Sequence, residues 1–581
     1  MAKVTDRIRL EVLKNALEGI ADGMALTLIR TSRSSVVRSG LDFSTGVLSA
    51  NGDLIGQGAC QPMHLGGMMP ALQSCIKRYK GNINPGDIFI TNDPYEGGSH
   101  LPDIFQYKPL FIGDKLIGFA CAMTHHTDIG GRVAGGNACD STEIYQEGLR
   151  IPPLKLYEAG EPNETMFRII EKAVRVPDKV MGDILGQVAA MNYGEQEYMK
   201  LINRYGIEGL DAHTEEMLDY TEELTRNTIR SWPDGEWSFT DYVDDDGITP
   251  DPIAIAVKIT KKGDELHFDF DGTSPQCKGA IQPVFPTTKA MVYAVLKCVM
   301  GVMGADVPNS SGYFRPVTVT APEGTFVNPM PPAPVAARSL GAMRIAQVVF
   351  GAFGKMLPDS IFACAGGCEL GVGMAGDDKS KTPWKPWVQL EFYNEQAGGG
   401  WPDHDGYDAQ NAGMMNMSNI PSEQLEAEQP ILVEEYGFTL DSEGAGKFRG
   451  GMGQTRTYRY LMDDTIVQMR ADRKKFQPYG VNGGQSPNPT RITLNPSNEN
   501  KDMPPKFLID VNKGDVVKIQ WPGAGGDGNP LHRAPDMVLQ DVIAEKVSID
   551  RAKDTYGVVI DLDSKTVDAG ATETLRAKMA K

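Results

Sequence analysis

Two apolar, β-rich runs in the first quarter of the chain constrain its fold most strongly. "GDIFITND" and "LIGFACAMTHH" each end in a cluster of polar side chains, as strands do when they deliver such residues to one edge of a sheet. The segment between them contains Pro94, Gly97, Gly98 and Pro102, which exclude a regular helix or a central strand. We therefore expect an ordered loop between two strands of one sheet.

Periodicity elsewhere predicts a mixed α/β (α+β) protein with several interleaved units. Residues 5–30 repeat apolar side chains at a helical period, 41–59 read as a hairpin turning at Asn51-Gly52, and 178–232 are mainly helical. A β-meander and two helices follow, and the chain is rich in strands and glycine from about 385 to 540. The expected divisions are a mixed α/β unit that holds the candidate site (1–235), a meander with helices (236–384), a β-rich unit (385–545) and a short tail (546–581).

Composition narrows the function classes. The chain has 57 basic and 76 acidic residues, giving a net charge of −19, and such a surface repels nucleic acids and anionic membranes. No apolar run reaches the roughly 18 residues needed to span a bilayer, and the start is an amphipathic helix pattern rather than a signal peptide. The eight cysteines are scattered, so we expect buried free thiols in a cytoplasmic protein.

Imidazole and carboxylate groups gather where the two β-rich runs end. Three of the eight histidines fall between residues 100 and 126. His100 and Asp103 are three residues apart on the Pro-stiffened loop, His125 ends the second run, and Asp42 precedes the first hairpin strand. This ligand set suits zinc, manganese or iron and leaves positions open for water. A metal-free hydrogen-bond network is the alternative interpretation.

Other polar motifs carry less information. Adjacent strand residues face opposite ways, so only one of His125 and His126 is expected to be a ligand. His64 is isolated and is expected to be structural. His404 lies among Asp403, Asp405 and Asp408, which could hold a second metal but is more typical of a solvated turn. Cys364 and Cys368 form a lone C-x-x-x-C, where a zinc ribbon needs two pairs.

The chain shows no convincing nucleotide site of its own. Gly371-x-Gly373-x-x-Gly376 is followed by "DDKSKTPWKPW", which is not the helix that a dinucleotide fingerprint requires. "GAGKFRGG" has Phe448 where a phosphate loop needs Ser or Thr. No Gly-x-Ser-x-Gly motif indicates a serine hydrolase.

Several motifs together resemble a known family. "NDPYEGGSHLPDI", "THHTDIGG", "GDILGQVAA", "FDFDGTSPQCKGAIQ" and "DSEGAGKFRGGMGQTRTYR" are similar, in this order, to the hydantoinase B / oxoprolinase family. The family includes B-type subunits of hydantoinases, 5-oxoprolinases and lactamases, and related subunits of acetone and acetophenone carboxylases. The resemblance covers roughly residues 5–560.

The resemblance implies a division of labour between two subunits. A partner of the hydantoinase A family, an A-type subunit with an actin-like ATPase fold, would bind ATP and phosphorylate the amide or enol oxygen of the substrate. The B-type subunit would finish the reaction at a divalent metal, where metal-bound water attacks the activated amide. The family's metal ligands fall on His100, Asp103 and His125 of this sequence, with Asp42 as fourth contributor.

The expected function is that of the metal-dependent subunit of an ATP-dependent cyclic amide hydrolase acting on a hydantoin, oxoproline or lactam. The corresponding subunit of a ketone carboxylase and a non-catalytic scaffold for the ATPase subunit are the alternatives. His126, Glu147 and Arg150 are candidate catalytic or substrate-orienting residues, against a structural ion pair for the last two. A hetero-oligomer is expected.

Overall fold

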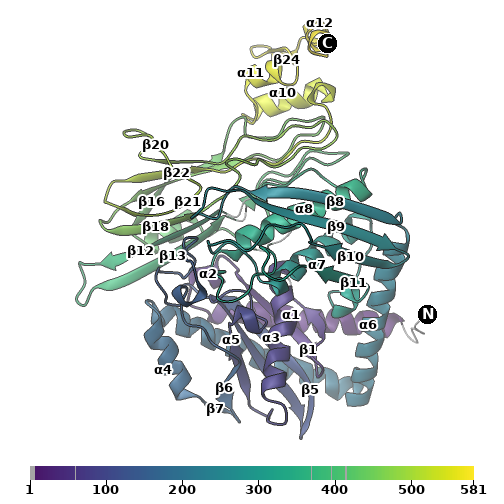
Figure 1. Ribbon diagram of the computed structural model, residues 1–581, viewed down its shortest axis with the longest axis vertical. Coiled ribbons are helices and arrows are strands. Elements are labelled where there is room, and N and C mark those ends of the chain that lie inside the picture. The colour runs from purple at the N-terminus through teal and green to yellow at the C-terminus, as the bar shows by residue number, and fades with distance from the viewer. Residues whose placement is uncertain are drawn as a thin grey trace.

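The computed structural model describes residues 7–58, 61–367, 370–393, 395–411, 415 and 417–580. In Figure 1 the N-terminal part lies at the bottom, the central part above it, the β-rich part at the upper left and the C-terminal helices at the top. The chain is thus a mixed α and β protein of several units with a β-rich C-terminal part, as the sequence predicts.

A seven-stranded antiparallel sheet organises the N-terminal unit. Its order is β2-β1-β5-β4-β3-β6-β7, which places the ends of β4 and β5 next to each other at the centre. The strands are β1 (Phe43–Ser49), β2 (Leu54–Gln57), β3 (Ile88–Thr91), β4 (Asp103–Ile112), β5 (Lys115–His125), β6 (Leu154–Glu158) and β7 (Glu161–Pro162).

The loop prediction is correct for only part of the segment between β3 and β5. Residues 92–102 form the loop, which includes the short 3₁₀ turn η2 (Pro94–Glu96), but β4 follows as a central strand between β5 and β3. Pro109 is tolerated because β3 pairs with β4 only from Phe105 to Tyr107. Its missing N–H is therefore not required on that side.

Helices cover both faces of this sheet. The long helices α1 (Arg7–Thr31) and α5 (Pro177–Tyr205) share one core with the strands, and α3 (Leu65–Arg78) packs in a second core on the other face. The predicted helix over 5–30 is confirmed from Arg7 onward, and residues 1–6 lie outside the described part. The predicted hairpin is also confirmed, and its turn has a positive φ of 87° at Gly52. The remaining helical elements are α2 (Ser35–Arg38), α4 (Glu164–Ala173), α6 (Ile207–Arg230), η1 (Pro62–His64) and η3 (Ile144–Gln146).

The central unit is a four-stranded sheet packed on two apolar helices. The predicted meander is β8 (Gly235–Val243), β9 (Ile253–Lys262) and β10 (Glu265–Asp269), extended by β11 (Val317–Thr320) after η4 (Ser311–Phe314). The helices are α7 (Phe285–Val302) and α8 (Arg338–Met356). Helix α8 is apolar nearly all round and is buried along almost its whole length, as a helix in the centre of a large core must be.

The β-rich part is a sandwich. One sheet has the order β13-β12-β18-β21 and the other β16-β17-β22-β19-β20, and their facing side chains form a single core. The strands are β12 (Leu370–Asp378), β13 (Lys385–Tyr393), β16 (Ile431–Phe438), β17 (Gln454–Tyr460), β18 (Thr465–Arg470), β19 (Arg491–Leu494), β20 (Lys501–Asp502), β21 (Lys506–Val511) and β22 (Val516–Gln520). β12 and β13 pair across the expected division at 384/385, so we place the start of this unit ahead of β12.

Short elements complete the chain. β14 (Glu395–Gln396) pairs with β15 (Gln410–Asn411), and α9 (Ser422–Glu428) precedes β16. The C-terminal module contains η5 (Pro530–His532), α10 (Pro535–Ile543), α11 (Ile549–Asp554), β23 (Ile560–Asp561), β24 (Thr566–Val567) and α12 (Ala569–Met579). α10 shares its small core with α11 and the segment after it, so we group α10 with the tail.

Two expectations from composition concern thiols and membranes. Cys75, Cys121, Cys139 and Cys364 are buried thiols, and Cys277 and Cys298 are partly buried thiols; Cys60 and Cys368 lie outside the described residues. None of the helices in the described ranges has the length and apolar character that crossing a membrane requires.

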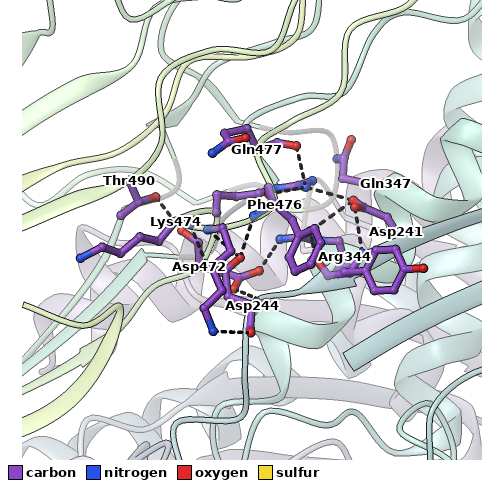
Figure 2. A network of polar contacts seen from close by, with 12 residues as sticks. Asp241, Asp244, Arg344, Gln347, Asp472, Lys474, Phe476, Gln477 and Thr490 are labelled. Atoms are coloured by element: carbon purple, nitrogen blue, oxygen red, sulfur yellow. Dashed lines mark hydrogen bonds and ion pairs between the residues drawn. The ribbon is translucent and has the colours of Figure 1, made fainter. Parts of the chain in front are cut away.

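A buried ion network joins the central unit to the sandwich (Figure 2). Arg344 of α8 donates to Asp472, and also to Asp241 of β8 at 3.2 Å, which in turn accepts from Arg473 at 3.0 Å. Asp244 accepts the backbone N–H groups of Lys474, Lys475 and Phe476 at 2.6–3.0 Å. The network therefore holds the segment that follows β18 against β8 and α8.

We expect the substitution Asp472→Ala to lower stability strongly. Asp472 is 1% exposed and pairs with both Arg344 and Lys506; removing it leaves two buried cations short of a partner, which costs about 3–5 kcal/mol. Calorimetric thermal unfolding should show a clearly lowered midpoint. Lys379→Ala, which breaks the exposed pair with Asp464, is the control and should cost no more than about 1 kcal/mol. Equal midpoints for the two variants would contradict a stabilising role for the network.

Candidate metal centre

The loop between β3 and β4 contains no regular strand and is held by hydrogen bonds from the side chain of Asn92 to the backbone. The amide of Asn92 donates to the carbonyls of Leu101 and Leu149 at 2.7 and 2.9 Å, and its oxygen accepts from Ile151 N–H at 2.6 Å. Gly97 has φ of 103°, and a Cβ there would lie 2.5 Å from the backbone of α3. The loop thus packs directly on α3, which fixes the position of the residues that follow.

Three predicted ligands converge at the end of the central strands. Asp103 and His125 are direct partners in the β4–β5 register, so their side chains share one face of the sheet. His100 lies in the loop three residues before Asp103, and its ring centroid is 5.0 Å from that of His125. One ligand atom from each of the three residues lies within 4.8 Å of the others, and all three residues are buried.

The hydrogen bonds of His100 show which of its ring nitrogens could hold a cation. Its Nδ1 donates to the carbonyl oxygen of Ala336 at 2.7 Å, and a carbonyl can only accept. Burial, followed by the nearby Arg338, lowers the pKa of His100, which favours the neutral ring, in which Nε2 carries a lone pair. That lone pair faces Asp103 Oδ1 at 3.0 Å. A metal ion would satisfy both atoms, and a metal-binding histidine usually donates its other ring N–H to a carbonyl or carboxylate in this way.

His125 also fits a ligand role. Its Nδ1 is buried and has no hydrogen-bond partner among the described residues, while its Nε2 lies 3.4 Å from the Asn137 amide. Burial, followed by the proximity of His100, holds the pKa of His125 well below its ordinary value. A neutral, partly unsatisfied imidazole next to a carboxylate is suited to binding zinc, manganese or iron.

A buried arginine compensates the charge of Asp103. Arg338, at the first turn of α8, donates to Asp103 Oδ2, which also accepts from Ser99. Burial alone would raise the pKa of Asp103, but Arg338 and His100 outweigh it and hold the pKa well below the ordinary range. The carboxylate is thus ionised, as a metal ligand must be.

A small cavity of about 20 Å³ adjoins these residues, enough for about one water. Asp42 lines it but is not among the three atoms that converge within 4.8 Å; it accepts from Gln61 at 3.1 Å, and His64 lies 3.6 Å from it. The walls come from all three large units, with Met63, Phe392, Met415, Met417 and Arg470 completing them.

The structure places three basic residues at the cavity that sequence reasoning did not assign to the site. His64, which was predicted to be structural, lines the cavity, and burial lowers its pKa to about 3; its structural role stays a prediction. Arg338 and Arg470 were not singled out, because they lie more than 200 residues beyond the histidines in sequence. The signal that could have found Arg338 is a charged residue at the first position of a mostly apolar helix.

Glu147 lies outside the cavity and contacts the backbone segment that holds His100. Its Oε1 accepts the N–H groups of Val335 and Ala336 at 2.7 and 2.9 Å, and the Ala336 carbonyl is the group that holds His100. Burial raises the pKa of Glu147 to about 8, although the two N–H groups oppose the shift. Its side chain thus contacts the backbone next to His100 and does not line the cavity.

Arg150 and His126 are also placed away from the cavity. Arg150 donates to Asp93 at 2.7 Å, in the loop ion pair that was the alternative interpretation. His126 Nε2 contacts Thr124 Oγ1 at 2.9 Å, and its electrostatic neighbours include Asp183 and Gln187 of α5. As the strand alternation predicts, His125 and His126 face different sides.

Two aspartates of the acidic loop around His404 form ion pairs with basic side chains. Asp405 pairs with Arg533 and Asp408 with Arg449 and Lys546, while the partly exposed His404 contacts Asp403. Within the described ranges, no such group other than that of His100, Asp103 and His125 has metal-binding geometry. The Gly371 motif lies within β12 and opens no helix, in agreement with its rejection as a dinucleotide site.

The sequence profile of the hydantoinase B/oxoprolinase family matches residues 6–530. The chain belongs to this family. It is 31% identical to the B-type component of a putative D-/L-hydantoinase from a Pseudomonas species, over 99% of this chain and 98% of that protein. This is consistent with the motif resemblance found in the sequence.

Solved structures of similar proteins have the same fold. The crystal structure of the ATP-dependent caprolactamase from Pseudomonas jessenii superposes with a TM-score of 0.90 at 31% identity, covering 99% of this chain and all of that one. A nucleotide-free acetone carboxylase structure also gives 0.90, over 100% of this chain and 84% of that one, but at 17% identity, which shows only a common fold. This chain therefore shares its architecture with both proteins.

We expect the buried carboxyl of Glu147 to make stability depend on pH. Its folded pKa of about 8 exceeds the ordinary 4.5, so unfolding releases a proton between these values and stability falls as pH rises through that window. Glu147→Gln keeps an acceptor oxygen but does not titrate. The melting temperature of the wild type should therefore fall relative to that of the variant up to about pH 8 and then level off. Parallel curves for both proteins would show that this carboxyl is not held neutral.

Proposed function

We propose that this chain is the metal-dependent subunit of an ATP-dependent hydrolase of cyclic amides. The observation that carries the proposal is the convergence of His100, Asp103 and His125 beside a buried cavity. The relatives that are about one-third identical over their full length are named as a hydantoinase subunit and a caprolactamase, and both names refer to cyclic amides. The carboxylase is more distant, at 17% identity.

The three residues would hold one divalent ion, with Asp42 as the nearest additional carboxylate of the cavity. A divalent ion supplies Lewis acidity, which polarises a carbonyl or phosphoryl oxygen and acidifies water. The donor set of two neutral imidazoles and an ionised carboxylate suits zinc, manganese or iron. The backbone carbonyl of Ala336 fixes the orientation of His100, and Arg338 keeps Asp103 ionised.

Apolar side chains of the cavity exclude bulk water. Met63, Phe392 and Met417 line it together with the polar residues. A dry site strengthens every charge interaction inside it and limits side reactions of an activated substrate. This is the environment in which an amide carbon, once activated, can be attacked by a single water.

Activation is assigned to a partner. An amide is a poor electrophile, and phosphorylation of its oxygen makes the carbon reactive. No phosphate-binding loop stands out among the described residues, and one relative is named as the B-type component of a hydantoinase. We therefore propose a hetero-oligomer with an A-type ATPase subunit, in which ATP and water yield ADP, inorganic phosphate and the ring-opened product. Buried thiols suit a reducing, cytoplasmic setting.

We expect His125→Ala to abolish amide opening while leaving the complex assembled. The change removes a ligand from the buried group, so both metal content and turnover should fall about 10²-fold or more, measured by elemental analysis and by product formation with the co-expressed partner. His404→Ala, a partly exposed histidine outside the cavity, is the matched control and should keep both. A metal-free wild type whose His125→Ala variant remains fully active would instead support the scaffold interpretation.

The reaction itself is tested by assaying the co-expressed pair with ATP. Hydantoins, 5-oxoproline, lactams, and ketones with bicarbonate form the substrate panel. We expect ATP hydrolysis coupled to opening of one or more cyclic amides, detected as the ring-opened acid by mass spectrometry. Incorporation of labelled bicarbonate into a ketone, with all amides left intact, would overturn the hydrolase proposal and assign the chain to the carboxylase branch.

A further inference from the structure

One lysine of helix α7 is partly buried without an ion pair. Each fully buried lysine of the described residues has a carboxylate partner: Lys155 has Asp87, Lys261 has Asp234 and Lys506 has Asp472. Lys297 is partly buried and forms no ion pair with any described residue. Its ammonium lies instead 5.8 Å from the ring centroid of Tyr313. In a chain with more acidic than basic residues, such a lysine needs an explanation.

An aromatic cluster lies beside Lys297. Tyr293, one helical turn earlier on α7, stacks on Phe314 with ring centroids 4.6 Å apart. Tyr313, which is 2% exposed, packs edge-on against Phe314 at 5.0 Å. These rings replace water around the ammonium of Lys297, and the loss of hydration favours the neutral amine.

Charged groups from two units face Lys297. Glu18 and Lys14 belong to α1 of the N-terminal unit, and Asp306 follows α7; with Lys297 they form what is called here the α1–α7 charge cluster. Burial is the largest influence and lowers the pKa of Lys297 to about 8, while Asp306 and Glu18 oppose the shift and Lys14 adds to it. Cys298, the next residue on the helix, stays a thiol because burial raises its pKa to about 11.

We propose that Lys297 is a nucleophile that small acyl phosphates acylate. The neutral amine attacks the carbonyl carbon and forms an amide bond; the bond from that carbon to the phosphate oxygen breaks, phosphate leaves with the electron pair, and one amine proton passes to solvent. Lysines that have lost hydration in apolar surroundings are activated for such attack. Because Lys297 is only partly buried, a small reagent can reach it. The inference depends neither on the proposed function nor on a metal.

Acylation would change the charge balance where α1 faces the central unit. An acylated lysine is an amide and carries no charge. Of the two lysines that face Glu18 and Asp306, only Lys14 would remain charged. The modification would thus leave the α1–α7 charge cluster with two carboxylates and one ammonium.

The test measures acetylation of the full chain by acetyl phosphate, with each lysine quantified by mass spectrometry. At pH 7 an amine with a pKa of about 8 is neutral about 300 times more often than one at the ordinary 10.5. A less basic nucleophile is intrinsically slower and burial restricts access, so we expect Lys297 to react at least about tenfold faster than Lys172, which is exposed on α4. The rate at Lys297 should rise up to about pH 8 and then level off.

Two substitutions on α1 should move this rate in opposite directions. Glu18→Gln removes an anion that favours the ammonium, so acetylation of Lys297 at pH 7 should become several-fold faster. Lys14→Gln removes a neighbouring cation, and the rate should fall several-fold for the opposite reason. Lys172 serves as the internal control and should react equally in all three proteins.

Three results would overturn the proposal. The first is a rate at Lys297 no higher than that at Lys172, and the second is a rate that neither substitution on α1 changes. The third concerns the chain unfolded in guanidinium chloride, where we expect the two lysines to react at similar rates. A difference that persists there would show that local sequence, and not the folded surroundings, activates Lys297. Circular dichroism in buffer establishes that each variant is folded.

Discussion

The site depends on the burial of one carboxylate, Asp103, which cannot remain ionised in the protein interior without a partner. Arg338 provides that partner from a helix more than 200 residues away in sequence, and His100 approaches from the same loop. A charged carboxylate beside neutral imidazoles is the donor set that the proposed divalent cation requires. The Ala336 carbonyl and the Ser99 hydroxyl hold the same groups by hydrogen bonds.

Helix α8 links this ion pair to the rest of the molecule. Arg338 at its start contacts Asp103, and Arg344 further along enters the ion network of Figure 2. That network fixes the segment that follows β18. Strand β18 itself ends at Arg470. The orientation of the sandwich and the geometry of the cavity are therefore connected through one buried helix, and this connection gives the two arginines of that mostly apolar helix a structural role.

Local patterns predicted much of this arrangement and failed at identifiable places. The strand ends, the alternation at His125 and His126, and the meander followed from the period of side chains alone. β4 was missed because the prolines and glycines between residues 94 and 102 were taken to exclude a strand from the whole segment, although all of them precede Asp103, where β4 begins. Pro109 within β4 is tolerated because the pairing with β3 ends at Tyr107. Glu147 and Arg150 were recognised as notable, but their contacts are with the backbone at Ala336 and with Asp93.

The sequence by itself determined the family, the fold class and the three residues that converge at the end of β4 and β5, because these depend on motifs and periods that are local in the chain. Tertiary structure alone decided which charges surround them. Arg338, Arg470 and the ring of His64 reach the cavity through packing of distant units, and no local pattern encodes that approach. The physical reason is that the charge balance of a buried site is a property of the surrounding volume, to which neighbours in sequence contribute only a part.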